Sequence, residues 1–343
     1  MYIPNTKWTW SFLLVALVQA IVALALEAYV FGRFQTSLRL KGQNKDAHNE
    51  PRTIPTYLAV FMFGYLYQLV LVYDALRLKN TIQVIGLVLY NVGILIYAAI
   101  QLDQIRDAVT ALDSNQLIVH HFWPQVKPML IALPCLMGLG TVIFAFLAWK
   151  LYDEFAWTIY KHISADLRLK RRYLTYQIYI ALLKFDFFFF LGFTVQFLVV
   201  VQNTTDVEFG LTIAVLFVTF ILLLLAAFWV RRENIAGMIV IILVYFCALA
   251  YFLFKLIRMY AADRARIEDY KPARKSLTSF AVITILLLLA TIVIACMCTH
   301  NFNKGLKPHI QTRKPGGGER GGKAYNTEMP SLSGPQPARM EID

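Results

Sequence analysis

Long apolar segments separated by short polar stretches set the pattern of this chain. Eight such segments cover residues 10–31, 56–73, 81–100, 128–149, 176–201, 209–230, 235–257 and 277–298. A helix of about 20 apolar residues crosses the hydrocarbon core of a bilayer, which is roughly 30 Å thick. The pattern therefore predicts an all-α, polytopic helical membrane protein, with a membrane domain over residues 1–298 and about eight transmembrane helices.

The second segment is the weakest of these candidates. At 56–73 it is the shortest, and it contains Gly64 and Gln68. With eight spans, the basic loops 32–55 and 258–276 would lie on the non-cytosolic side, against the usual bias of Lys and Arg. A re-entrant second segment would give seven spans instead. Eight spans are the prediction, and seven are the alternative.

The distribution of basic residues between the loops sets the orientation. The segment 168–172 reads Arg-Leu-Lys-Arg-Arg, whereas 202–208 has neither Lys nor Arg. Because Lys and Arg accumulate in cytosolic loops, the first segment is predicted to be cytosolic and the second to lie on the opposite side. Arg231 and Arg232, after the sixth span, return to the cytosol as this requires. The C-terminus is then cytosolic.

Two stretches outside the spans have patterns of their own. Residues 153–172 carry apolar side chains at helical spacing beside polar ones, which predicts an amphipathic helix on the cytosolic face. Residues 299–343 are rich in Gly, Pro and polar residues, and they cannot bury a core. This stretch is predicted to be a disordered cytosolic tail.

Composition supports the assignment to membrane proteins and limits the kinds of partner that we expect. The chain has 343 residues, of which 58% are hydrophobic and 16% charged; a soluble chain would carry about 25% charged residues. The mean hydropathy is +0.56. The net charge of +12 sits in the loops and tail, where it sets topology. We therefore expect the lipid bilayer as the partner, and no nucleic acid.

Two opposite charges interrupt the fifth apolar segment. Lys184 and Asp186 fall near the middle of 176–201, where a charge costs a few kcal/mol or more unless it is paired or hydrated. Residues two apart on a helix do not face each other, so each charge needs a partner on another span or a polar cavity. The candidate partners are Glu27, Asn91, Tyr90, Gln68 and Asp74.

The two charges and two of their candidate partners form the candidate intramembrane polar site. It comprises Lys184, Asp186, Glu27 and Asn91, and its functional interpretation is a site for an ion, a proton or a polar substrate. The alternative is a buried structural pair that fixes helix packing. Glu27 also has a simpler interpretation, in which its carboxylate reaches the membrane interface.

A second candidate site lies on the cytosolic face. The basic side chains beside the predicted amphipathic helix suit the headgroups of anionic lipids, and they are Arg168, Lys170, Arg171 and Arg172. The alternative is that these charges only set topology.

Sequence motifs for catalysis and metal binding are absent. The chain has no GxSxG, HExxH or GxxxxGK[ST] motif. Its four cysteines form no CxxC pair and no zinc-like cluster with histidine. We therefore expect no catalytic residues, no metal and no cofactor, and we expect that the protein is not an enzyme.

The stretch from Ile163 to Tyr173, together with Leu183-Lys-Phe-Asp-Phe-Phe-Phe-Phe190, resembles a fungal family of polytopic Golgi apparatus membrane proteins. The similarity extends over the membrane domain and leaves out the tail. It implies a multi-span fold and residence in the Golgi or a related endomembrane. The family is uncharacterised, so the resemblance implies no activity and no ligand.

Three classes of function remain open. A transporter-like protein would move an ion or polar solute along a path that includes Lys184 and Asp186. A non-catalytic scaffold or trafficking factor would use the amphipathic helix and tail. A receptor-like sensor is the third class.

Overall fold

The computed structural model describes residues 4, 6–38, 50–114, 118, 122–162, 167–200, 206–261 and 273–304. These residues form long helices: α1 (Lys7–Ser37), α2 (Glu50–Arg77), α3 (Thr81–Ser114), α4 (Phe122–His162), α5 (Leu167–Val200), α6 (Asp206–Arg232), α7 (Ile235–Ala261) and α9 (Arg274–His300). Within the described residues, 8 helices are long and apolar enough to cross a membrane. The prediction of an all-α protein with eight spans is confirmed. The re-entrant alternative for the second segment is wrong, because α2 is one helix of 28 residues.

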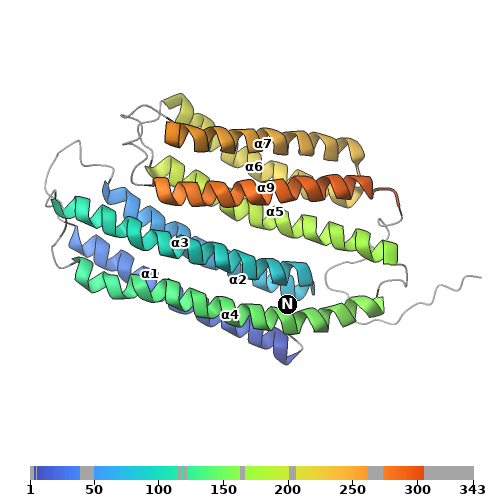
Figure 1. The fold of residues 1–343 in the computed structure, drawn as a ribbon, viewed down its shortest axis with the longest axis horizontal. Coiled ribbons are helices and arrows are strands. Elements are labelled where there is room, and N and C mark those ends of the chain that lie inside the picture. Colours follow the sequence, from blue (N-terminus) through green and yellow to red (C-terminus); the bar gives the residue numbers. More distant parts are fainter. Residues whose placement is uncertain are drawn as a thin grey trace, which may run out of the picture.

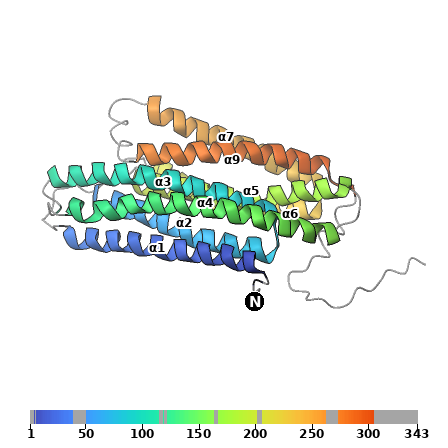
Figure 2. The ribbon, with the colours of Figure 1, turned by 60° about the horizontal axis from the view of Figure 1, so that its bottom comes forward.

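Among the described helices, α1 to α4 form one group, and α5, α6, α7 and α9 form another (Figures 1 and 2). In the first group, α1 and α3 each contact both α2 and α4. In the second group, α5 and α7 each contact both α6 and α9. Each group is thus a ring of neighbouring helices, called here the first bundle and the second bundle. They meet where α5 packs on α2 and α3, and where α9 packs on α3.

Aromatic rings from α5 fill space that glycines leave open at this junction. A Cβ atom on Gly64 of α2 would lie 3.0 Å from the ring of Phe188, and one on Gly93 of α3 would lie 2.8 Å from Phe189. Gly86 of α3 makes a similar close approach to Phe185. The run of phenylalanines in α5 therefore packs into the small residues of α2 and α3.

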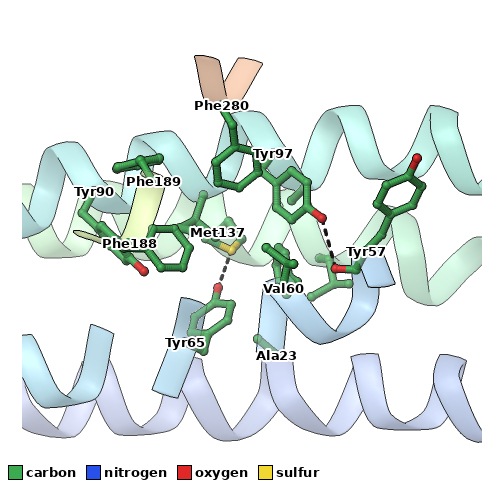
Figure 3. Close-up of a cluster of buried hydrophobic side chains, with 14 of the residues drawn as sticks. Ala23, Tyr57, Val60, Tyr65, Tyr90, Tyr97, Met137, Phe188, Phe189 and Phe280 are labelled. Atoms are coloured by element: carbon green, nitrogen blue, oxygen red, sulfur yellow. Dashed lines mark hydrogen bonds between the residues drawn. The ribbon is translucent and has the colours of Figure 1, made fainter. Parts of the chain in front are cut away.

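The same rings join a cluster that reaches into α9 (Figure 3). Tyr90 lies edge-on to Phe188, with ring centroids 5.0 Å apart, and Tyr97 lies edge-on to Phe280 of α9, also at 5.0 Å. Aromatic pairs in this geometry add to the stability that burial alone provides. The junction between the bundles is thus a continuous aromatic core.

The outer surface of both bundles is apolar. Many large hydrophobic side chains are exposed along the helices, for example Leu89, Val142, Phe217, Leu243 and Leu286. In water such a surface would drive association, whereas in a bilayer it is solvated by lipid tails.

The segment predicted as a separate amphipathic helix falls in two elements. Residues 153–162 are the last part of α4, and 167–172 begin α5, while 163–166 lie outside the described residues. Both ends of the segment therefore extend membrane-crossing helices. The predicted tail begins within the last turn of α9, and its residues 305–343 lie outside the described part of the chain.

Candidate intramembrane polar site

Lys184 is held by two polar side chains from the first bundle. Its Nζ forms an ion pair with Asp74 and donates a hydrogen bond of 2.9 Å to Oε1 of Gln83. Gln83 also donates from Nε2 to Oδ2 of Asp74, at 3.0 Å, and to the carbonyl of Leu71, at 2.9 Å. The three side chains therefore satisfy one another, and Lys184 is not an isolated charge.

The sequence predicts that Lys184 lies near the middle of its span, but the structure places it at a different depth. Asp74 lies in the last turn of α2 and Gln83 in the first turn of α3, so the ion pair lies beside the turn between these helices. The reason is that α5 begins at Leu167, well before the apolar segment, and extends past the α2–α3 turn (Figure 1).

Asp186 faces the second bundle. Thr291 of α9 donates a hydrogen bond of 2.6 Å to its Oδ2. Its Oδ1 is buried and has no hydrogen-bond partner among the described residues. Asp186 also lines a cavity of about 60 Å³ between α5, α6, α7 and α9. Lys184 and Asp186 thus point to different bundles, as expected for residues two apart on a helix.

Glu27 lies in the core of the first bundle. Its side chain is fully buried, at 0% exposure, and its Oε1 accepts a hydrogen bond of 3.0 Å from Nε2 of Gln101. Its second oxygen has no partner in the described part of the chain. The interpretation in which Glu27 reaches the membrane interface is therefore wrong, because α1 turns this residue toward α3.

Asn91 connects all four helices of the first bundle. Its Oδ1 accepts from Gln19 of α1, at 3.3 Å, and from Gln68 of α2, at 3.5 Å. Its Nδ2 donates to Thr141 of α4, at 2.9 Å. Hydrogen bonds of this kind between membrane helices contribute about 1 kcal/mol each.

A polar stripe on α3 connects these contacts. It consists of Gln83, Asn91 and Gln101, all of them buried. Gln83 and Gln101 are 18 positions apart, which is about 27 Å along a helix, close to the thickness of the hydrocarbon core. Buried polar side chains therefore follow α3 across most of the membrane.

The four predicted residues are consequently in separate places. Lys184 lies at the α2–α3 turn, Asn91 and Glu27 lie at two levels of the stripe, and Asp186 lies in the second bundle. The sequence prediction did not include Gln83, Gln101 and Thr291 among the partners. Gln83 and Gln101 stand at the two ends of an apolar segment, which is the signal that could have indicated them.

The basic residues of the second candidate site lie in the first turns of α5. They are Arg168, Lys170, Arg171 and Arg172. Arg172 donates from Nη1 to the carbonyl oxygen of Lys304, at 2.6 Å, which ties the start of α5 to the residues after α9. Among the described residues, no three His, Cys, Asp or Glu side chains form a group that could hold a metal ion.

The fold and its buried polar stripe define a polytopic helical membrane protein. The chain is 37% identical over 324 residues to the UPF0658 Golgi apparatus membrane protein of Schizosaccharomyces pombe, and the alignment covers 88% of this chain and 90% of the relative. The chain therefore belongs to this family of Golgi apparatus membrane proteins. No protein-family model matches the chain. No solved structure matches it either.

Proposed function

We propose that this protein is a transporter-like protein of the Golgi membrane that moves an ion or a polar solute. Its location in the Golgi follows the name of the S. pombe relative. The stripe on α3 is the observation that supports transport. Buried polar side chains are costly in a membrane, and where they occur they mark pathways for ions and polar substrates.

Glu27 accepts a hydrogen bond from Gln101 of the stripe, but its second carboxylate oxygen has no hydrogen-bond partner among the described residues. A buried carboxylate whose second oxygen has no partner is costly, and a transported cation or proton would supply what is missing. Purely structural polar contacts between helices would not need a carboxylate here, because the amide of a Gln would pair with Gln101 equally well.

The test is flux through the purified protein in liposomes. Wild-type protein should carry H⁺, Na⁺ or K⁺ faster than empty liposomes do, as measured with ion-sensitive dyes under an imposed membrane potential. Glu27→Gln keeps the size and hydrogen-bonding capacity of the side chain and should reduce flux at least tenfold. The matched control is Gln177→Leu, because Gln177 is buried and its Nε2 donates to the hydroxyl of Tyr173 on its own helix. Flux equal to empty liposomes, or unchanged in Glu27→Gln, would refute the proposal.

A scaffold or trafficking role is the second candidate, and the four basic residues at the start of α5 favour it. Each basic side chain near an anionic surface contributes about 1 kcal/mol, screened by salt. Replacing Arg168, Lys170, Arg171 and Arg172 with Gln should lower the amount of anionic phospholipid that co-purifies with the protein, measured against phosphatidylcholine. An unchanged ratio would leave these charges with a role in topology only.

A further inference from the structure

The cavity beside Asp186 has the features of an ion site. It lies inside the second bundle and has a volume of about 60 Å³. Asp186 is 6% exposed, and its Oδ1 has no hydrogen-bond partner among the described residues. We propose that this cavity binds a small monovalent cation such as Na⁺, held by the Asp186 carboxylate and by neighbouring hydroxyl groups.

The charge of Asp186 has no counter-charge among the described residues that line the cavity. None of the residues that line the cavity is Lys, Arg or His. Lys184 is close in sequence, but its Nζ is engaged by Asp74 and Gln83 of the first bundle. An isolated carboxylate in a low-dielectric interior is strongly unfavourable, whereas a bound cation would compensate it.

Three residues that carry hydroxyl groups line the cavity and would supply further oxygen ligands, although the hydroxyl of Tyr245 also shares a hydrogen bond of 3.0 Å with that of Tyr179. Thr219, Tyr245 and Thr284 line it together with Asp186. The hydroxyl of Thr284 donates its proton to the carbonyl of Phe280, at 2.7 Å, so its lone pairs remain available to a cation. Thr291 donates to Asp186 itself, which fixes the carboxylate while leaving Oδ1 free.

The chemistry of these ligands selects the class of ion. Oxygen ligands suit alkali and alkaline-earth ions, and the lining has no His or Cys that would favour a transition metal. Only one carboxylate lines the cavity, whereas protein sites for Ca²⁺ commonly use several. A single negative charge with neutral hydroxyls matches a monovalent ion, and the volume leaves room for water to complete its coordination.

The site is independent of the proposed path along α3. It lies in the second bundle, so an ion could bind here whether or not the stripe in the first bundle conducts. Binding can therefore be measured without transport, and a failure of one proposal leaves the other standing.

The experiment is thermal unfolding of the full-length protein in detergent. NaCl should raise the midpoint in a saturable way relative to choline chloride at equal ionic strength, because a ligand that binds only the folded state stabilises it. The shift should disappear in Asp186→Asn. It should persist in Gln177→Leu, the matched control, because Gln177 is a buried polar residue of the same helix that does not line the cavity.

Two conservative variants keep the test decisive if Asp186→Asn does not fold. Tyr245→Phe and Thr219→Val remove single oxygens with little change in volume, and each should raise the Na⁺ concentration at half-effect by about tenfold. The proposal is overturned if wild-type protein unfolds at the same temperature in NaCl and choline chloride. It is also overturned if Asp186→Asn retains the full Na⁺ shift, or if both single-oxygen variants match the wild type.

Discussion

At the scale of single residues, two neighbouring charges on one helix have different surroundings. Lys184 has an acidic partner and an amide partner on α2 and α3, whereas in the described part of the chain Asp186 accepts a hydrogen bond from the hydroxyl of Thr291 alone. The sequence predicted that each charge needed its own partner, because the i, i+2 spacing is a property of any helix. It could not select Asp74 from five candidates, since that choice depends on how α2 and α5 pack.

This difference predicts how charge removal affects stability. Asp74→Asn and Lys184→Met should each lower the unfolding temperature, because each leaves the other charge uncompensated. The double change should cost less than the sum of the two, by about 1 kcal/mol for a partly exposed pair. Lys184→Met combined with Asp186→Asn is the control, and its effects should add, since the two side chains are hydrogen-bonded to different bundles. Additive effects for Lys184 and Asp74 would show that their ion pair contributes nothing to stability.

At the scale of helices, the positions of the spans followed from the apolar pattern but their ends did not. The fifth segment was expected from residue 176, yet α5 begins at Leu167. Hydropathy detects the apolar part of a helix, and the basic residues of the first turns of α5 are good helix formers outside that part. In the same way, 153–162 continues α4 beyond its apolar part.

The glycines of α2 and α3 make the packing of α5 testable. Gly93→Ala would place a methyl group against Phe189, and overpacking of this kind costs about 1–3 kcal/mol. Gly138→Ala in α4 is the matched control, because no described atom outside its own stretch of helix backbone and its two chain neighbours lies within 4 Å of the new Cβ. The control should be neutral or stabilising by up to about 1 kcal/mol, given the better helix propensity of Ala. Both are measured by thermal unfolding in detergent. Equal midpoints for the two variants would contradict the packing described here.

At the scale of the whole molecule, each of the two bundles contains the same type of turn between helices, which the sequence analysis did not predict. The turn between α2 and α3 and the turn between α6 and α7 have the same hydrogen bonds. Asn80 N–H donates to Ala75 O at 3.0 Å, and Asn234 N–H donates to Trp229 O at 3.1 Å. Before each Asn stands a residue with positive φ, Lys79 at 47° and Glu233 at 54°. This is the Schellman arrangement, with Asn placed to begin the next helix.

Contacts at the end of the molecule that holds these turns also show which segments lie on the same side of the membrane. Asn303, just after α9, donates its N–H to Oε2 of Glu233 in the α6–α7 turn, at 2.9 Å. Arg172 of α5 contacts Lys304. The start of α5, the α6–α7 turn and the beginning of the tail are therefore on one side, which the basic residues predict to be cytosolic.

Reporter fusions test this orientation. A reporter after Asp343 and one inserted at the α6–α7 turn should both be cytosolic and unglycosylated. A glycosylated reporter inserted between α5 and α6, at 201–205, is the positive control for the opposite side. Glycosylation of the C-terminal reporter would reverse the orientation, and with it the proposed contact with cytosolic lipid headgroups.

The place of the Lys184–Asp74 ion pair has a consequence for biosynthesis. Domains and helices emerge in the order of synthesis, so α2 and α3 are made before α5 supplies the lysine. During that interval Asp74 has no cation, and a carboxylate in the middle of the bilayer would oppose insertion of its own helix. Because Asp74 lies in the last turn of α2, water at the membrane surface can hydrate it until α5 arrives. We therefore expect that the unpaired Asp74 does not prevent the first bundle from inserting into the membrane before α5 is synthesised.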